Sequence, residues 1–339
     1  MRRSSRPLNV AIAGATGAVG SVLLEILEER KFPVGWLRPL ASRRSQARRV
    51  RFRGESLTVQ PLESGAFDGA DLVFFAATGE LSKRWAPEAV AAGAVVVDKS
   101  GSWRMDPSVP LVVPEINAAA LDGHRGIVAS PNCTTTGVVM ALEPLRRAAG
   151  LRRVVITTLQ AASGAGQAGA DELAQQLAAS ARGERPIPSV FAAPLAHNVV
   201  PLCDQLLPEQ GGSSSEECKL RDETRKILGE PELPVTATCV RVPVPVGHSA
   251  SVWIETRRPL EPEAARRALA AFPGVRCFTD SDPLPTPQGV AGCDEVRVAR
   301  VRAGSDGSLW LWQVSDNLRK GAATNAVQIA EVLCARGLL

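Results

Sequence analysis

Short apolar runs alternate with helical patterns over the first 150 or so residues of the chain. The apolar runs stand at 8–13, 36–41, 71–77 and 94–98, and the helical patterns at 19–27 and 83–92. Near-continuous apolar strands that alternate with helices are typical of a parallel sheet covered on both faces. We therefore expect an α/β domain at the N-terminus. Pro39 is awkward inside a central strand, and we expect it to mark a bulge.

The pattern changes after about residue 151, where the strands lengthen and alternate as in a sheet with one buried face. We expect strands at 239–246, 251–257, 295–302 and 308–315, and helices at 170–182, 216–228, 263–271 and over the last 20 residues. Asp306-Gly307 is a hairpin signal between the last two strands. The fold class is thus α/β: a Rossmann-type domain over 1–130, an α+β domain over 131–317, and a C-terminal helix, 318–339, that returns to the first domain.

Composition excludes several classes of protein. The chain has 339 residues, enough for about two domains, and its net charge of +4 and lack of Tyr argue against nucleic acid as a partner. The sequence contains no run of about 20 apolar residues, so we expect no membrane-spanning helix. The basic Met1–Arg6 segment lacks a clean apolar region behind it, so we expect no signal peptide.

Cysteine and histidine usage narrows the chemistry further. The seven Cys form no CxxC pair, and no two of the three His stand four residues apart. We therefore expect free thiols, a cytoplasmic location and no metal.

A glycine-rich turn, Gly14-Ala15-Thr16-Gly17-Ala18-Val19-Gly20, separates the first predicted strand from the first helix. A dinucleotide pyrophosphate requires close backbone approach and a helix N-terminus aimed at the anion. Tight strand–helix packing is the alternative explanation of the glycines, but the strand–turn–helix context favours a dinucleotide site. The predicted contacts are Gly14, Thr16, Gly17, Ala18, Val19 and Gly20.

The second predicted strand ends without the acid that binds the ribose 2′-hydroxyl of NAD. It is followed instead by Ser42-Arg43-Arg44-Ser45. Hydroxyl and guanidinium groups suit a 2′-phosphate, although a solvated basic loop is the alternative. We expect NADP as the cofactor, bound through Ser42, Arg43 and Ser45.

Cys133 stands in Ser130-Pro131-Asn132-Cys133, just before a helical pattern that runs to Leu145. The dipole at a helix N-terminus favours the thiolate, and a thiolate can carry a covalent acyl intermediate. Most free thiols are inert core residues, but none of the other six has this placement. Cys133 is therefore the predicted nucleophile.

At these motifs the chain resembles the aspartate-β-semialdehyde dehydrogenases, over nearly its whole length. The resemblance is carried by GATGAVG at 14–20, LASRRS at 40–45, SWRMD at 102–106, SPNCTTTG at 130–137, QAASGAG at 160–166, EECKLRDETRKIL at 216–228, RVPVPVGHS at 241–249 and SDNLRKGAATNAVQIAE at 315–331. It implies reversible, NADP-dependent reductive dephosphorylation of L-aspartyl-4-phosphate to L-aspartate-4-semialdehyde. That step feeds the biosynthesis of lysine (through diaminopimelate), threonine, methionine and isoleucine. The resemblance also implies a homodimer.

The resemblance assigns roles to individual residues. It implies that Cys133 forms a thioester, that His248 moves the proton and that Gln160 orients the acyl group. Asn132 and the Cys133 backbone N–H are expected to stabilise the oxyanion. The resemblance further gives the α-carboxylate to Arg241, the α-ammonium to Glu216, the phosphate to Lys219 and Arg104, and part of the cofactor site to Ser163, Gly164 and Asn317.

Some residues leave alternatives open. On its own, Ser213-x-x-Glu216 indicates a capping box at the start of a solvated helix. Lys99 replaces the Asn usual in this family, and 203–215 departs from the family pattern.

Three other functions can be compared with these residues. N-acetylglutamyl-phosphate reductase would perform the same chemistry without needing Glu216 as a counter-ion. A catalytically silent NADP-binding relative would have lost Cys133 or His248, and both are present. Glyceraldehyde-phosphate dehydrogenases usually carry Thr-Thr-Asn after the nucleophile, where this chain has Thr-Thr-Thr.

Overall fold

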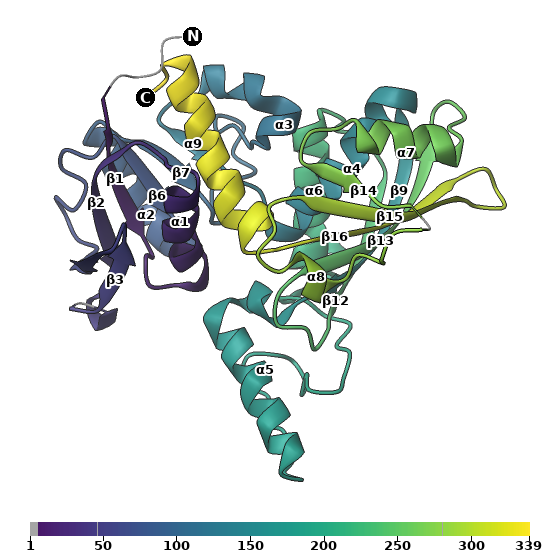
Figure 1. Ribbon diagram of the computed structural model, residues 1–339, viewed down its shortest axis with the longest axis horizontal. Helices are drawn as coiled ribbons and strands as arrows, with labels where there is room; N and C mark the ends of the chain where they lie inside the picture. Colours follow the sequence, from purple (N-terminus) through teal and green to yellow (C-terminus); the bar gives the residue numbers. More distant parts are fainter. Residues whose placement is uncertain (1–5, 46, 280) are drawn as a thin grey trace. The chain divides into compact units, whose positions relative to one another are not determined.

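The computed structural model describes residues 6–45, 47–279 and 281–339, so the basic segment before Arg6 lies outside the described residues. The chain forms two compact units (Figure 1). Unit 1 runs to Asn132 and includes Ala322–Leu339, and unit 2 is Cys133–Gly321. Among the described residues, no helix has both the length and the apolar character needed to cross a membrane.

Unit 1 is built on a parallel sheet with the strand order β5-β2-β1-β6-β7-β8. The strands are β1 (Leu8–Ala13), β2 (Val34–Ala41), β5 (Gln60–Pro61), β6 (Leu72–Phe75), β7 (Val95–Asp98) and β8 (Ile127–Ala129). The chain winds one way from β1 to β2 and the other way to β6. In such sheets, ligands bind outside the carboxyl ends of the strands where the winding reverses. The Rossmann-type prediction is confirmed.

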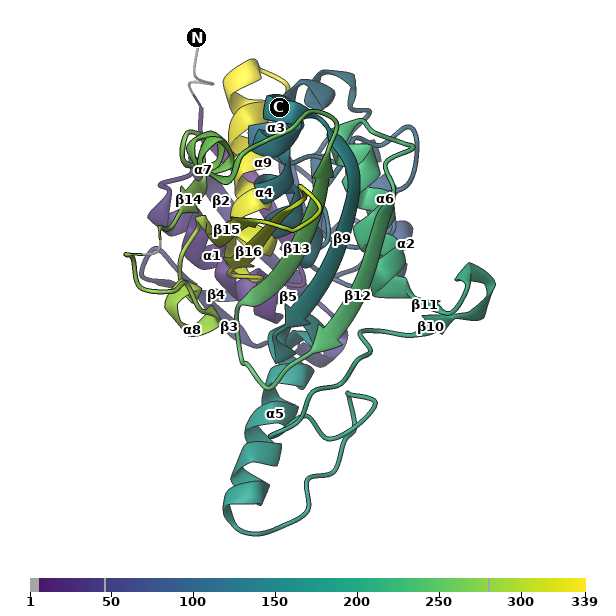
Figure 2. The same ribbon diagram turned by 90° about the vertical axis from the view of Figure 1, so that its right-hand side faces the viewer.

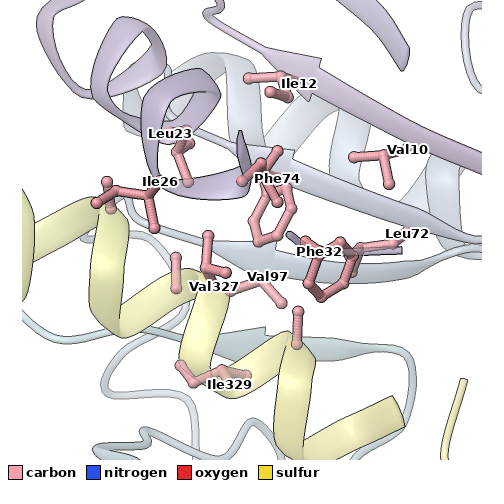
Figure 3. Close-up of a cluster of buried hydrophobic side chains, with 14 of the residues drawn as sticks. Val10, Ile12, Leu23, Ile26, Phe32, Leu72, Phe74, Val97, Val327 and Ile329 are labelled. Carbon is pink, nitrogen blue, oxygen red and sulfur yellow. The ribbon is translucent and has the colours of Figure 1, made fainter. Parts of the chain in front are cut away.

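Helices cover both faces of this sheet, which explains the unbroken apolar strands. Val10 and Ile12 of β1 pack with α1 (Ala18–Glu29) and α9 (Thr324–Arg336), whereas Ala11 and Ala13 face the cluster that contains α2 (Gly79–Ala91). Figure 3 shows Leu23, Ile26 and Val327 close to side chains of the sheet, and Ile329 of α9 belongs to the same cluster. The C-terminal helix therefore completes the core of unit 1, as predicted.

The remaining elements of unit 1 are short. They are β3 (Arg49–Phe52) and β4 (Glu55–Thr58), which form a hairpin, together with α3 (Pro114–Asn117) and the 3-10 helices η1 (Arg43–Ser45) and η2 (Ala118–Gly123).

The bulge predicted at Pro39 is wrong. The pairing of β1 with β2 runs through Ile12 and Pro39 without interruption, and its one irregularity falls between Leu8 and Asn9. The missing N–H of Pro39 is tolerated because β5 pairs with β2 only at Leu40 and Ala41.

Unit 2 contains a mixed sheet with the order β12-β9-β13-β16-β15-β14, whose strands β12, β9, β13 and β16 lie side by side in Figure 2. The strands are β9 (Leu151–Gln160), β12 (Val235–Arg241), β13 (His248–Thr256), β14 (Val275–Cys277), β15 (Val296–Ala303) and β16 (Leu309–Ser315). Helices α4 (Cys133–Ala149), α6 (Ser215–Leu228) and α7 (Pro262–Ala270) cover one face. Gly307, at φ +79°, lies in the predicted turn between β15 and β16.

The other elements of unit 2 lie at its margins. Helix α5 (Gly166–Ala181) extends away from the sheet in both views (Figures 1 and 2). The others are η3 (Ala162–Ala165), β10 (Leu206–Leu207), η4 (Pro208–Gln210), β11 (Ser213–Ser214), α8 (Pro287–Val290) and the π-helix η5 (Arg319–Ala323).

The second face of this sheet is half-exposed and carries tryptophans among polar side chains. Trp253 pairs across the strands with Trp310 on one side and with Val155 on the other, so the three share this face. Trp312 is paired with Ser251 and projects from the same face. All four large side chains are only partly buried.

The strand predicted over 239–246 is also wrong. Strand β12 ends at Arg241, and the chain is irregular from 242 to 247 before β13 begins at His248. Pro243 and Pro245 have no N–H to donate to a ladder, so the valines at 242, 244 and 246 do not continue the strand. His248 therefore begins a strand instead of ending one.

Candidate active site

The predicted nucleophile and the predicted proton carrier are in contact within unit 2. Cys133 is the first residue of α4, and His248 is the first residue of β13. The Cys133 Sγ lies 3.3 Å from the His248 Nε2. Cys133 is partly exposed and His248 is buried. A reactive sulfur at a helix N-terminus thus has one side open and an imidazole on the other.

The tautomer of His248 follows from its second contact. The Ala161 backbone N–H donates to His248 Nδ1 over 3.0 Å, so a neutral ring carries its proton on Nε2, facing the sulfur. Burial first, and the positive charge of Arg241 second, hold the pKa of His248 well below its usual value. The resting imidazole is therefore neutral and donates a hydrogen bond to Cys133.

Helix α4 approaches the sheet closely behind the nucleophile. A Cβ on Gly137 would lie 2.5 Å from Gln313 Nε2 and 2.6 Å from Ser315 Oγ. Both partners are buried, and Gln313 Nε2 donates to Ser315 Oγ over 3.0 Å. The glycine one turn after Cys133 therefore sets how near the start of the helix comes to β16.

Arg241 and His248 bind different backbone groups of the same residue, Ala161. It is buried at the end of β12, and its guanidinium donates to the Ala161 carbonyl over 2.7 Å. A Cβ on Gly164 would lie 2.6 Å from Arg241 Nη1 and 3.0 Å from His248 Nε2. The peptide groups of Ala161 thus hold a cation and an imidazole together, and Gly164 leaves space beside them.

Gln160, Glu216 and Lys219 form a connected polar group. Gln160, the last residue of β9, donates to Glu216 Oε1 over 3.2 Å, and both are buried. Lys219 Nζ lies 3.3 Å from Glu216 Oε2 and 2.5 Å from Asp204 Oδ2. Burial acts to lower the pKa of Lys219, but the two carboxylates outweigh it and the pKa is raised.

The capping box at this helix differs from the sequence interpretation. Ser214 caps α6 and forms the reciprocal pair with Glu217, so the predicted pairing of Ser213 with Glu216 is wrong. Because helix α6 starts at Ser215, Glu217 takes the N3 position. The carboxylate of Glu216 faces Gln160 and Lys219 and is not used in the cap.

Asn317 links the remaining predicted residues of unit 2. Its Nδ2 donates to Ser163 Oγ over 2.9 Å, and its Oδ1 accepts from the Gly247 N–H over 2.9 Å. Ser163 and Gly164 lie in η3, directly after Ala161. Asn317 thus connects η3 with the residue that precedes His248.

Unit 1 carries the glycine turn at the carboxyl end of β1. Gly14 has φ +90°, and a Cβ there would lie 2.4 Å from the Ala76 carbonyl oxygen, beyond the end of β6. A Cβ on Gly20 would lie 2.1 Å from the Gly14 oxygen. The turn continues through Thr16 to Gly17, the N-cap of α1; Ala18 and Val19 begin the helix.

This turn fits a dinucleotide pyrophosphate. Gly17 makes no side-chain capping bond, and the first turn of α1 has no acidic residue. The backbone N–H groups at the start of the helix are thus presented to an anion without a competing carboxylate. The turn also lies where the winding of the sheet reverses.

The residues predicted for the 2′-phosphate follow β2. Ser42 and Arg43 are exposed, Ser45 is half-buried, and the Ser45 N–H donates to the Ser42 carbonyl. Arg43 forms an exposed ion pair of 3.2 Å with Glu63. Such a pair is weak in water, so a phosphate can compete for the guanidinium.

Arg104 and Lys99 both bind the segment that leads to the nucleophile. Arg104 is buried and donates to the Ser130 and Lys99 carbonyls over 3.1 and 2.7 Å. Lys99 Nζ donates to the Pro131 carbonyl over 2.6 Å. Asn132, which is buried, ends unit 1.

Sequence reasoning missed Ala161 and Asp204. Ala161 acts through backbone groups, which no side-chain pattern reveals. Asp204 lies in the stretch that departs from the family pattern, and its only signal was that departure.

Both parts of the chain match models of one protein family. Residues 9–124 match the model described as the NAD binding domain of semialdehyde dehydrogenases, and residues 142–320 match the one described as their dimerisation domain. An aspartate-semialdehyde dehydrogenase of Synechocystis sp. is 45% identical over 337 residues, which are 98% of this chain and 99% of that protein. One from Bacillus subtilis is 43% identical over 340 residues, covering 97% and 98%.

Solved structures agree with these relatives. An aspartate semialdehyde dehydrogenase II of Vibrio cholerae, described as complexed with ASA, is 44% identical and covers 98% of this chain and 99% of its own, with a TM-score of 0.95. An aspartate semialdehyde dehydrogenase of Candida albicans, described with NADP, is 25% identical and covers 98% and 100%, with a TM-score of 0.78.

Proposed function

The chain belongs to the semialdehyde dehydrogenase family, and on that premise we propose that it converts L-aspartyl-4-phosphate to L-aspartate-4-semialdehyde, reversibly and with NADP. The observation that carries the proposal is the 3.3 Å contact between Cys133 Sγ and His248 Nε2 at the start of α4. The chain contains a nucleophile, an imidazole beside it, and charged groups that can bind a zwitterionic substrate. Its relatives of similar length are named for this activity.

Cys133 performs the acyl transfer. Its thiolate, stabilised by the start of α4 and by the Nε2–H of His248, attacks the acyl carbon, and phosphate leaves to give a thioester. Bound NADPH would supply the hydride that reduces this thioester. The C–S bond of the resulting thiohemiacetal then breaks, which releases the aldehyde and restores the Cys133 thiolate. Asn132 and the Cys133 N–H stabilise the negative oxygen that develops at the same carbon.

His248 first acts as a hydrogen-bond donor. Full proton transfer through the ring requires Nδ1 to take a proton, and that atom now accepts the Ala161 N–H. Proton movement is therefore coupled to release of the Ala161 hydrogen bond. Burial first, and the charge of Arg241 second, lower the pKa of His248 and so disfavour the imidazolium as well.

The substrate's three charges find partners of opposite sign. Arg241 takes the α-carboxylate, Glu216 the α-ammonium, and Lys219 and Arg104 the phosphate. Gln160, which is already hydrogen-bonded to Glu216, orients the acyl group. The buried Glu216 favours a free ammonium over an acylated amine, so N-acetylglutamyl-phosphate reductase is not the preferred function.

We assign cofactor binding to 1–130 with 318–339, and catalysis to 131–317. The glycine turn and the start of α1 hold the pyrophosphate, through residues 14 and 16–20. Ser42, Arg43 and Ser45 hold the 2′-phosphate, and Ser163, Gly164 and Asn317 complete the cofactor contacts.

The protein is a homodimer that serves amino-acid biosynthesis, in the steps toward lysine, threonine, methionine and isoleucine. Its second domain matches the family's dimerisation domain and carries the half-exposed tryptophan face. We place it in the cytoplasm, because all seven cysteines are free thiols among the described residues.

A spectrophotometric assay tests the function. NADPH formation should require aspartate semialdehyde together with phosphate, and N-acetylglutamate semialdehyde should be a poor substitute. The variant Cys133→Ala should lose turnover by about 10³-fold or more while binding NADP normally in calorimetry. Cys334→Ala is the matched control, because burial raises the pKa of that thiol to about 11 and it lies on α9. Turnover retained by Cys133→Ala would refute the nucleophile assignment.

A further inference from the structure

Lys219, which the proposed function assigns to the phosphate, already has two anionic partners. Its Nζ lies 2.5 Å from Asp204 Oδ2 and 3.3 Å from Glu216 Oε2. Two carboxylates around one ammonium leave this group with a net charge of about −1 before any substrate arrives. A phosphate that binds Lys219 therefore meets an ammonium whose charge is already neutralised by carboxylates.

The two carboxylates differ in how firmly they are held. The Glu216 side chain is 7% exposed and accepts a hydrogen bond from Gln160, whereas the Asp204 side chain is 43% exposed. Asp204 precedes helix α6 and lies on an irregular segment, with φ +62°. Besides its ion pair with Lys219, Asp204 accepts from α6 a long, exposed hydrogen bond of 3.4 Å from Ser215 Oγ, so Asp204 is held less firmly than Glu216.

The substrate neutralises only one of these charges. In the proposed function its α-ammonium pairs with Glu216, but it offers no cation to Asp204. When phosphate binds Lys219, the Asp204 carboxylate must either stay close to a dianion or give up its ion pair. Both outcomes weaken phosphate binding.

We infer that Asp204 is a specificity-determining residue, which occupies Lys219 as an internal anion and competes with the phosphate group for it. This inference rests on the proposed function, and it adds a residue that tunes the affinity for one half of the substrate. Asp204 lowers the affinity for phosphate without touching the reacting carbon. Its effect is therefore confined to the Michaelis constant for phosphate.

The test compares steady-state constants for aspartate semialdehyde, phosphate and NADP. Asp204→Asn should lower the KM for inorganic phosphate by about 3- to 10-fold and change the other two constants by less than about 2-fold. Asp204→Glu keeps the charge and should leave the phosphate KM near wild type. Asp222→Asn is the matched control, because Asp222 pairs with Arg221 on the same helix at 2.6 Å and does not contact Lys219.

Protection of Cys133 from alkylation gives a second, non-kinetic measure of phosphate binding. Inorganic phosphate should protect Cys133 from iodoacetamide at a lower concentration in Asp204→Asn than in wild type, by the same factor.

An unchanged or raised phosphate KM in a folded Asp204→Asn variant would overturn the inference, because it would mean that Asp204 only orders Lys219. Absence of turnover in the wild-type protein would instead contradict the proposed function, and the inference with it.

Discussion

At the scale of single residues, His248 shows how two contacts define the state of one ring. The Ala161 N–H occupies Nδ1, and the Cys133 sulfur faces Nε2. Because the ring is buried and lies near the positive charge of Arg241, binding of a second proton to the ring is unfavourable. The sequence identified His248 by family resemblance, but its tautomer depends on a backbone group 87 positions away.

This arrangement predicts a pH-dependent stability. The pKa of His248 is held below 6.5 in the folded protein, chiefly by burial, and unfolding restores a value near 6.5. Below about pH 6.5 the unfolded chain binds the extra proton, so the free energy of unfolding falls as the pH falls, by up to about 1.4 kcal/mol per pH unit. Above that pH the ring is neutral in both the folded and the unfolded chain, so His248 no longer lowers the free energy of unfolding.

Urea denaturation between pH 7.5 and 5 measures this slope. His248→Gln should remove His248's share of it, and His197→Asn, at an exposed position with φ +57°, should not. An identical slope in wild type and His248→Gln would show that His248 does not resist protonation in the folded protein.

At the scale of elements, helix α4 determines where the nucleophile lies. The sequence located its start correctly, because Cys133 precedes a helical apolar pattern that is local in the chain. The distance between this helix and β16 is a tertiary property. It depends on Gly137 meeting Gln313 and Ser315, which are far away in sequence.

Gly137→Ala should therefore destabilise the protein by about 1–3 kcal/mol, because the new methyl group overlaps two buried polar side chains. The better helix propensity of Ala, worth about 1 kcal/mol, acts in the opposite direction and does not remove the overlap. Urea denaturation checks this. Gly123→Ala is the control, since no atom lies within 4 Å of a Cβ at that position. Equal stability of the Gly137→Ala variant would mean that α4 moves away from β16 without cost.

At the scale of the whole molecule, the two units differ in how completely the faces of their sheets are covered. Both faces of the sheet in unit 1 are covered within the unit, and α9 supplies part of one face from the end of the chain. In unit 2 the face that carries Trp253 and Trp310 is only partly buried. We expect the homodimer interface to cover this tryptophan-bearing face.

Light scattering should therefore report twice the chain mass of 35.8 kDa. Trp253→Arg places a charge on the half-exposed face and should shift the protein toward the monomer at low micromolar concentration. Lys83→Glu, exposed on α2 of unit 1, should leave the mass unchanged. A Trp253→Arg variant that stays folded by circular dichroism and fully dimeric would place the interface elsewhere.

The sequence alone was sufficient wherever the physical cause is local. Apolar periodicity identified β1 and α1, glycine spacing identified the turn between them, and the position before a helix identified Cys133. The same local reasoning failed at 239–246, because alternating valines predict a strand while the prolines between them forbid one. Local patterns therefore predict elements reliably only when backbone hydrogen bonding agrees with them.

Tertiary structure decided which groups meet. The Cys133–His248 contact spans 115 positions, and the Gln160–Glu216 hydrogen bond spans 56. The capping box lies one residue later than predicted, at Ser214 and Glu217. Glu216 is therefore not part of the cap, and its carboxylate faces Gln160 and Lys219. Such contacts depend on how sheets and helices pack, and packing is set by many distant side chains together. No single segment of the sequence therefore specifies these long-range contacts.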